Sequence, residues 1–279
     1  MEKDYRQLSF EFFPTKTDRG KEKLQKLAKK LKQFSPEYFS VTFGAGGSTR
    51  EGTLNTCLAL LESKVQICPH ISGIGSTKSS IKEIVENYLN NGMNRLVVLR
   101  GDLPSGIGSV GDFPFALDLI NYLNKIGEDK LEIEISAYPE IHPEAENGDS
   151  DFQNFLNKVN AGAHGAITQF FFDPDPFFSF MEKCEKNKVS IPVIPGIMPI
   201  HNAEALLRMA TNCGANIPVW LKEGIEKYNN EKDFINYGIE VISSLCEKLL
   251  DFGVSGIHFY TVNREEPTKS IIRNLNFIK

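Results

Sequence analysis

The sequence contains few cysteines and no long apolar run. Its five cysteines, Cys57, Cys68, Cys184, Cys213 and Cys246, are odd in number and no two are close in sequence. Neither a disulfide framework nor a CxxC metal or redox site is therefore expected. No apolar stretch reaches the roughly 18 residues of a membrane span, and residues 1–7 lack the apolar core of a secretory signal. These absences predict a reduced, cytoplasmic protein with no membrane partner.

The sequence also lacks an excess of positive charge. The 31 lysines and arginines are outnumbered by 36 acidic residues, which gives a formal net charge of −5. Nucleic-acid-binding proteins usually carry a basic surface, so no nucleic-acid partner is expected. Hydrophobic residues make up 41% of the chain, enough to offset the ordering entropy, so the composition excludes a largely disordered protein.

Short apolar runs alternate with amphipathic stretches along the whole chain. The expected strands are residues 8–13, 38–42, 66–68, 95–99, 132–137, 165–170, 191–194 and 256–260. The expected helices are residues 21–34, 54–61, 81–89, 115–126, 152–159, 177–187, 203–211 with a further helical stretch to 250, and 270–275. Eight such units without an internal linker predict an α/β protein, a single-domain (β/α)8 TIM barrel over residues 1–279. The alternative is a doubly wound open sheet.

Polar residues that are unusual for a sheet lie within these strands or directly after them. In a barrel they would converge on the rim where active sites are found, which predicts an enzyme. They are Glu11, Thr42, His70, Arg100, Gly101, Asp102, Tyr138, Glu140, His142, Gln169, Thr261, Asn263 and Arg264.

Glu11 lies among three phenylalanines, and strand alternation places Ser9, Glu11 and Phe13 on one face. Such surroundings should desolvate the carboxyl group and raise its pKa, which suits a general acid near neutral pH. The alternative is a strand carboxylate paired with a buried arginine or lysine.

The tripeptide Arg100, Gly101 and Asp102 ends an apolar strand. Arginine can bind phosphate or carboxylate, and aspartate can stabilise a cation. The alternative is an internal ion pair between Arg100 and Asp102. Residues 106–111 match G-x-G-x-x-G but do not directly follow their strand, so a loop over the active site is a better interpretation than a dinucleotide fingerprint.

The five histidines show no zinc-binding spacing, and no metal is expected. His164 follows a helix and is expected to be structural or solvated. His258 lies in the last strand and is expected to be a core residue with satisfied hydrogen bonds.

Eight peptides at the strand ends resemble those of bacterial methylenetetrahydrofolate reductases. They occur in that family's order between about residues 8 and 275. The peptides are residues 10–14, 40–42, 68–70, 99–104, 137–145, 166–173, 194–199 and 258–264. The family has a flavin-containing (β/α)8 barrel, which agrees with the pattern of strands and helices.

The resemblance implies that NADH, or NADPH, reduces bound FAD, which then passes hydride to 5,10-methylenetetrahydrofolate in a ping-pong reaction. The product, 5-methyltetrahydrofolate, would supply methyl groups for methionine synthesis. Glu11 matches the family's general acid, and Asp102 matches an aspartate near flavin and pterin that would stabilise the 5-iminium cation. A homo-oligomer such as a tetramer, and the lack of a C-terminal regulatory domain, are also implied.

The resemblance also implies the binding residues. Those for FAD are Thr42, His70, Leu99, Arg100, Gly101, Asp102, Ala116, Tyr138, His142, Asp151, Asn154 and Lys158, and those for folate are Gln169, Phe177 and Arg264. The sequence departs from the enterobacterial pattern at Asn157 and Phe115, where arginine and tyrosine are common, so FAD is expected to dissociate readily. Met209 stands where an aromatic residue would stack on the nicotinamide.

Two other functions fit a barrel of this kind. One is a pterin-binding enzyme that transfers a methyl group, or condenses a pterin, without a flavin. The other is a barrel that has lost activity and binds folate or forms complexes.

Overall fold

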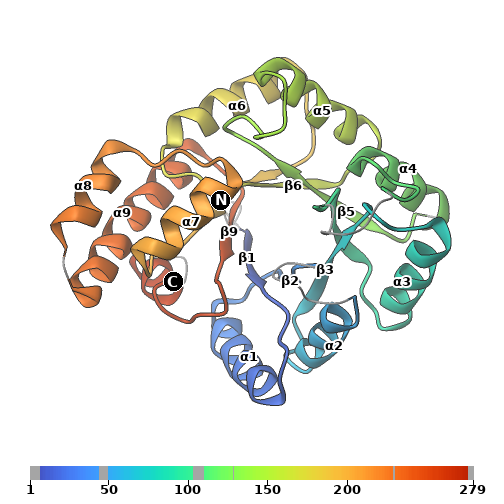
Figure 1. Cartoon of the computed structure of the whole chain (residues 1–279), viewed down its shortest axis with the longest axis horizontal. Coiled ribbons are helices and arrows are strands. Elements are labelled where there is room, and N and C mark those ends of the chain that lie inside the picture. Colours follow the sequence, from blue (N-terminus) through green and yellow to red (C-terminus); the bar gives the residue numbers. More distant parts are fainter. Residues whose placement is uncertain (1–6, 44–49, 103–109, 128, 229, 276–279) are drawn as a thin grey trace, which may run out of the picture.

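Parallel strands form a barrel at the centre of the molecule, and helices surround it (Figure 1). The computed structural model describes residues 7–43, 50–102, 110–127, 129–228 and 230–275. The strands are β1 (Gln7–Phe12), β2 (Tyr38–Val41), β3 (Gln66–Ser72), β4 (Arg95–Leu99), β5 (Glu132–Ala137), β6 (Gly165–Thr168), β7 (Val193–Ile194), β8 (Gly196–Ile197) and β9 (Gly256–Tyr260). Their order in the sheet is β7-β6-β5-β4-β3-β2-β1-β9-β8.

The barrel closes through a strand that is interrupted by one proline. Pro195 separates β7, which pairs with β6, from β8, which pairs with β9. The carbonyl oxygen of Pro195 accepts a hydrogen bond of 3.0 Å from the backbone N–H of His258. Because proline has no N–H of its own, strand pairing is interrupted at Pro195, and two short strands are found where only one, residues 191–194, was expected. The (β/α)8 barrel prediction is confirmed, and the doubly wound open sheet is excluded.

The helices follow the strands in the expected alternation. They are α1 (Asp18–Leu31), α2 (Arg50–Leu61), α3 (Lys78–Asn90), α4 (Ala116–Gly127), α5 (Gly148–Asn160), α6 (Pro174–Lys186), α7 (Ala203–Cys213), α8 (Val219–Lys227), α9 (Glu231–Phe252) and α10 (Thr268–Asn274), with a short 3-10 helix, η1 (Lys32–Phe34). The start of α5 at residue 148 rather than 152 has a local cause. The Asn147 side chain accepts hydrogen bonds from the N–H groups of Asp149 and Ser150, which caps the helix one turn earlier.

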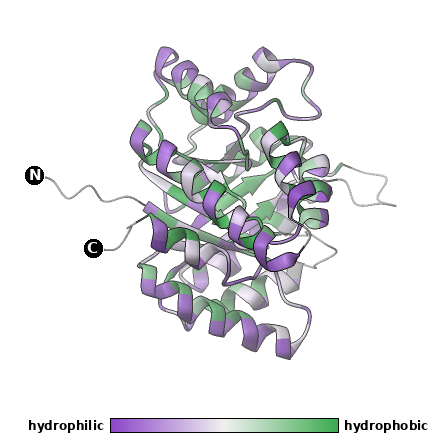
Figure 2. Cartoon of the chain, turned by 90° about the vertical axis from the view of Figure 1, so that its left-hand side faces the viewer, coloured by the Kyte–Doolittle hydropathy of each residue, from purple (hydrophilic) through white to green (hydrophobic). Residues whose placement is uncertain are grey.

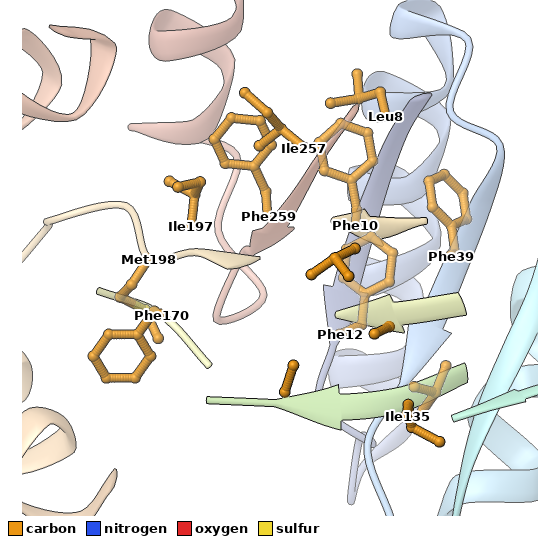
Figure 3. Close-up of a cluster of buried hydrophobic side chains, with 14 of the residues drawn as sticks. Leu8, Phe10, Phe12, Phe39, Ile135, Phe170, Ile197, Met198, Ile257 and Phe259 are labelled. Carbon is orange, nitrogen blue, oxygen red and sulfur yellow. The ribbon is translucent and has the colours of Figure 1, made fainter. Parts of the chain in front are cut away.

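The two faces of each strand contribute to different layers. On β1, Leu8, Phe10 and Phe12 belong to the main core, which also contains the buried residues of the helices (Figure 3). Ser9 and Glu11 alternate with them and so face the barrel interior. The interior also holds a small apolar cluster of Tyr38, Cys68, Val97 and Ile167. Glu11, near the carboxyl end of β1, therefore shares the barrel interior with this apolar cluster.

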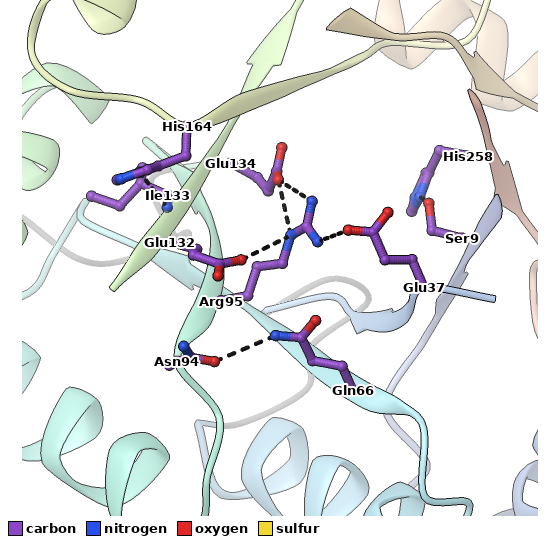
Figure 4. A network of polar contacts seen from close by, with 10 residues as sticks. All are labelled: Ser9, Glu37, Gln66, Asn94, Arg95, Glu132, Ile133, Glu134, His164 and His258. Atoms are coloured by element: carbon purple, nitrogen blue, oxygen red, sulfur yellow. Dashed lines mark hydrogen bonds and ion pairs between the residues drawn. The ribbon is translucent and has the colours of Figure 1, made fainter. Parts of the chain in front are cut away.

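A buried ion-pair network lies at the amino end of the strands (Figure 4). The Arg95 guanidinium lies 2.6 Å from a Glu134 carboxylate oxygen, also pairs with Glu37, and stacks 4.3 Å from the centre of the Tyr38 ring. Gly165 leaves the space for Glu134, because a Cβ there would lie 2.4 Å from its Oε2. This network was not predicted from the sequence.

The distribution of hydropathy follows the layers. The central strands are largely hydrophobic, and the helices carry hydrophilic residues along their outer sides (Figure 2). In the part of the chain that the structure describes, no helix is long and apolar enough to cross a membrane.

Candidate active site at the carboxyl ends of the strands

Glu11 lies between two imidazole rings at the carboxyl end of the barrel. Its Oε2 atom is 3.3 Å from Nε2 of His70 on β3 and 3.8 Å from Nε2 of His258 on β9. The Glu11 side chain is 12% exposed, whereas the two histidines are almost completely buried. Neither Nε2 atom has a hydrogen-bond partner among the described residues. The carboxyl group is thus reachable from the rim and otherwise enclosed.

Burial sets the protonation of these three groups. It raises the pKa of Glu11, an effect that the neighbouring His70 partly opposes. Burial also lowers the pKa of His70 to about 4 and that of His258 to about 3. Near neutral pH both imidazoles are therefore uncharged, and Glu11 keeps its proton to a higher pH than an ordinary glutamate. Among the described residues, these histidines are the basic side chains within 4 Å of the Glu11 carboxyl group, and the alternative of a buried lysine or arginine partner is not found.

His258 combines a structural contact with one that faces the site. It is fully buried, as predicted, and its Nδ1 lies 2.7 Å from the Ser9 hydroxyl. The expectation that its hydrogen bonds are all satisfied is wrong, because Nε2 faces Glu11 without a hydrogen bond. The barrel prediction could have shown that His258 lies near Glu11, because closure makes the first and last strands neighbours.

Four of the predicted FAD-binding residues lie at the carboxyl ends of β2 and β4 or directly after them. Thr42 has a buried Oγ1 atom without a hydrogen-bond partner in the part of the chain that the structure describes. Leu99 ends β4 and is half-buried, Gly101 has a φ of +79°, and Asp102 is exposed. A Cβ on Gly101 would lie 1.9 Å from Oγ of Ser72, so only glycine fits this turn.

Arg100 pairs with Glu144 and not with Asp102. Its Nη1 and Nη2 atoms lie 2.6 and 2.8 Å from the two carboxylate oxygens of Glu144, a bidentate contact. The alternative of an Arg100–Asp102 ion pair is therefore wrong. Residues 103–109, which include most of the glycine-rich loop, lie outside the described residues.

The segment between β5 and α5 forms a second part of the site. The rings of Tyr138 and His142 are 4.5 Å apart, and the His142 N–H donates to Asp151 at 2.9 Å. The Lys158 ammonium donates to the Ser136 carbonyl oxygen at 2.7 Å, and burial lowers its pKa to about 8. Tyr138, Asp151 and Lys158 line a cavity of about 120 Å³ between α5 and α6.

Two further predicted FAD-binding residues lie on α4 and α5, outside the lining of this cavity. Ala116 is the first residue of α4 and is half-buried. Asn154 is exposed on α5, and Asn157 accepts a hydrogen bond of 3.0 Å from Gln153.

Two of the three predicted folate-binding residues follow strands at the rim. Gln169 comes directly after β6, and its side chain interacts with that of Tyr138. Arg264 is exposed after β9. Phe177 differs, because it is completely buried on α6 and stacks on Phe171 with ring centres 5.4 Å apart. The structure therefore does not bring Phe177 together with the other two.

His164 has a structural contact far along the chain from Glu11. His164 accepts a 3.1 Å hydrogen bond from the Ile133 N–H at the amino end of the barrel, so its predicted structural role is confirmed. Among the described residues, no group of three acidic, histidine or cysteine side chains could hold a metal ion.

The fold and the site define a class: a (β/α)8-barrel enzyme with an enclosed acid at the carboxyl ends of its strands. The sequence matches methylenetetrahydrofolate reductase over residues 1–276, and the chain belongs to that family. A 5,10-methylenetetrahydrofolate reductase of Buchnera aphidicola (subsp. Schizaphis graminum) is 37% identical over 269 residues, covering 95% of this chain and 90% of the relative. That of Escherichia coli K12 is 33% identical over 270 residues, with coverage of 96% and 90%.

A plant relative and a solved structure are also similar to this chain. Methylenetetrahydrofolate reductase (NADH) 1 of Arabidopsis thaliana is 34% identical over an alignment of 285 positions that covers 97% of this chain and 48% of the relative. An uncharacterised Clostridium thermocellum protein that binds two copies of 5-methyl-5,6,7,8-tetrahydrofolic acid is similar in structure, with a TM-score of 0.70. It is only 16% identical, covers 97% of this chain and 94% of its own, and shows the fold alone.

Proposed function

We propose that this chain reduces 5,10-methylenetetrahydrofolate to 5-methyltetrahydrofolate with FAD as cofactor and NADH as donor. The observation that carries the proposal is the enclosed carboxyl group of Glu11, whose pKa burial raises, in a chain of the methylenetetrahydrofolate reductase family. The name of the Arabidopsis relative, methylenetetrahydrofolate reductase (NADH) 1, favours NADH over NADPH.

Several features of the described residues fit FAD. Thr42 Oγ1 and His70 Nε2 are buried polar atoms that have no hydrogen-bond partner among the described residues. Gly101 keeps the backbone free of a side chain at the end of β4, and Lys158 offers an amine at the cavity beside Tyr138. The residues that would hold the cofactor are Thr42, His70, Leu99, Arg100, Gly101, Asp102, Ala116, Tyr138, His142, Asp151, Asn154 and Lys158.

Bound FAD would accept hydride from NADH and give it to the folate, with the two substrates binding in turn as in a ping-pong reaction. The chain itself would supply the proton. Glu11 would protonate N10 of the substrate, directly or by relay, so that the methylene bridge opens to the 5-iminium cation. The Asp102 carboxylate would stabilise that cation, and Gln169 and Arg264 would bind the folate.

Other parts of the proposal concern the surroundings of the reaction. The product would supply methyl groups for methionine synthesis in the cytoplasm. The chain would form a homo-oligomer such as a tetramer, which sedimentation velocity would measure directly.

The test is an anaerobic visible absorption titration of the FAD-supplemented protein. NADH should bleach the flavin, and added 5,10-methylenetetrahydrofolate should restore its absorption. If NADH leaves the flavin oxidised, the titration is repeated with NADPH. A protein that binds no flavin, or whose flavin neither nucleotide reduces, would favour the flavin-free pterin barrel or the inactive folate-binding barrel instead.

A further inference from the structure

The turn that follows β9 is clamped to the end of β1 by one side chain. The last register pair of these two strands is Glu11 and Tyr260. Beyond that pair, Asn263 bonds to both backbone groups of Phe13. Its Oδ1 atom accepts a 2.8 Å hydrogen bond from the Phe13 N–H, and its Nδ2 atom donates one of 2.9 Å to the Phe13 carbonyl oxygen. An amide side chain thus continues the hydrogen bonding between the two strands after their ladder has ended.

The same turn has an unfavourable backbone conformation. Val262 and Asn263 have φ values of +46° and +58°, in the left-handed region. Asparagine tolerates this conformation, but a β-branched valine rarely adopts it. Such a conformation persists only where the surrounding contacts hold it, and it is often found at functional sites. Here the Thr261 hydroxyl adds to the contacts of Asn263, because it donates to the Glu11 carbonyl oxygen at 2.6 Å and accepts from the Asn263 N–H at 3.2 Å.

The clamped turn carries Arg264. The Arg264 N–H donates to the Thr261 carbonyl oxygen at 2.9 Å, so its backbone is tied to the turn, whereas its side chain is exposed. Burial lowers the pKa of His201, on the segment after β8, and the nearby positive charge of Arg264 lowers it further. The guanidinium therefore lies near the carboxyl ends of β8 and β9, on the side of the barrel where the enclosed acid is found.

An exposed arginine binds a substrate well only where its backbone is held in place. Its long side chain already loses rotamer freedom when it binds, and ordering a mobile turn at the same time would add to that cost. The contacts of Asn263 and Thr261 tie the turn to β1, which is the strand that carries Glu11. Arg264 and the proposed proton donor are thus held by one rigid unit.

We propose that Asn263 is a positioning residue, which holds Arg264 where it binds the folate by fixing the turn after β9 to Phe13. This inference rests on the proposed function, in which Arg264 binds the folate. Asn263 acts through Arg264 and has no contact of its own with the substrate. Its loss therefore weakens folate binding and leaves flavin reduction by NADH unchanged.

The substitution Asn263→Gly removes the clamp without adding backbone strain. Glycine adopts a positive φ readily, so this variant loses the two hydrogen bonds to Phe13 while the turn can keep its conformation. Asn124→Ala is the matched control, because the Asn124 side chain also donates to a distant backbone group, the Ala161 carbonyl oxygen, at 2.5 Å. Arg264→Ala, and the double variant that carries both Asn263→Gly and Arg264→Ala, complete a double-mutant cycle.

The experiment is anaerobic stopped-flow absorption of the FAD-loaded wild type and these variants. Flavin reoxidation over a range of 5,10-methylenetetrahydrofolate concentrations gives an apparent dissociation constant for the folate and a limiting rate. We expect Asn263→Gly to raise that constant about 10-fold, the cost of one hydrogen bond to a charged group. Its limiting rate, and reduction by NADH in every variant, should stay within about twofold of wild type.

The double variant gives the decisive comparison. Its dissociation constant should equal that of Arg264→Ala alone, because a residue that acts only through Arg264 has no effect once that side chain is gone. A merely structural role of Asn263 would weaken binding by the same factor in both backgrounds. Asn124→Ala should bind the folate as the wild type does.

The outcomes distinguish the two proposals. If the wild type shows neither half-reaction, the proposed function fails, whatever the variants do. If the wild type turns over, three results refute the positioning role: Asn263→Gly binds the folate as tightly as wild type, its loss multiplies with that of Arg264→Ala, or Arg264→Ala itself leaves folate binding unchanged. Should Asn263→Gly fail to fold, as shown by its thermal unfolding, Asn263→Asp takes its place in the cycle. Its carboxylate can still accept from the Phe13 N–H, while the bond to the carbonyl oxygen is lost.

Discussion

Glu11 shows how one side chain can depend on its surroundings for its chemistry. Its neighbours on β1 point outward into the core, and its own carboxyl group points inward between His70 and His258. Burial, rather than a charged partner, dominates its pKa and raises it. A carboxyl group in this state is suited to donating a proton near neutral pH, which an exposed glutamate would have lost.

Glu11→Gln should remove the proton donor while keeping the size of the side chain. We expect the rate constant of the folate half-reaction to fall about a hundredfold to ten-thousandfold, with flavin reduction by NADH retained. Glu140→Gln is the matched control, because burial also raises the pKa of this rim carboxyl group, which accepts a 3.0 Å hydrogen bond from the Asn216 N–H. Stopped-flow absorption of both variants checks the prediction, and unchanged folate turnover in Glu11→Gln would rule out the general-acid role.

The pH dependence of the folate half-reaction should follow the same group. A general acid works only while protonated, and the pKa of Glu11 is raised, so the rate should be highest below that pKa and fall as pH rises through it. Glu11→Gln should abolish this descending limb. The measurement is the reoxidation rate of the reduced flavin against pH, and a rate that rises with pH would contradict the assignment.

At the scale of elements, the ends of single strands define the site. Gly101 turns the chain directly after β4 with a φ of +79°, and its missing Cβ lets Ser72 of β3 approach. The Ser72 hydroxyl donates a 2.8 Å hydrogen bond to the Arg100 carbonyl oxygen. The close approach of two strand ends therefore fixes the loop that carries Arg100 and Asp102.

Gly101→Ala should destabilise the protein more than backbone strain alone would. A comparable positive φ occurs at Gly92, where a Cβ would meet nothing within 4 Å, so Gly92→Ala measures the strain by itself. That strain costs about 1–2 kcal/mol of unfolding free energy. We expect Gly101→Ala to lose clearly more in urea unfolding and to weaken FAD binding, and equal losses in the two variants would show that the Ser72 contact is unimportant.

The amino end of the barrel depends on one buried cation. Arg95 on β4 bonds to Glu134 on β5 and to Glu37 before β2, and so connects three strands. Arg95→Met would leave the buried carboxyl group of Glu134 and the half-buried one of Glu37 without their partner and should lower the unfolding free energy by about 3–5 kcal/mol.

The control for this change is an exposed pair. Lys82→Ala removes the contact of 3.8 Å between Lys82 and Glu86 on the surface of α3 and should cost less than about 1 kcal/mol. Urea unfolding of both variants makes the comparison, and a loss in Arg95→Met no larger than that in Lys82→Ala would show that the network adds little stability.

At the scale of the whole molecule, closure of the barrel joins the first and last parts of the chain. The seam runs through Gly196, whose N–H donates to Thr168 Oγ1 at 2.9 Å. The hydroxyl of Tyr260 donates to the Thr168 carbonyl oxygen at 2.7 Å across the same point. This seam also brings His258 beside Ser9, so the site exists only in the closed barrel.

Gly196→Ala should therefore damage the barrel as a unit. The added Cβ would lie 2.2 Å from the Thr168 carbonyl oxygen and 2.5 Å from the Tyr260 ring. Because the clash involves backbone, we expect a loss of about 3 kcal/mol or more of unfolding free energy. Gly148→Ala, where a Cβ would make only ordinary contacts at 3.6 Å with Ile141, should change stability by no more than about 0.5 kcal/mol. Similar urea midpoints for the two variants would argue against a rigid seam.

Periodicity predicted the architecture well, and local chemistry explains the differences. Strands β4, β5 and β9 have the predicted limits. Strand β3 runs past Pro69 to Ser72, where a break was expected, because its neighbours supply the ladder on both sides. Phe177 was predicted from a resemblance that carries no helical phase, and the capped start of α6 turns its ring into the core.

Local patterns in the sequence were enough to predict the alternation of strands and helices, the polar residues at the strand ends, and the face of β1 that carries Ser9 and Glu11. These are local properties, set by residues a few positions apart. The folded barrel was needed to show what surrounds Glu11, that Arg100 pairs with Glu144, that Phe177 is internal, and that His258 faces Glu11. Each of these contacts joins residues distant in the chain, and their geometry is fixed only when the strands close into a barrel.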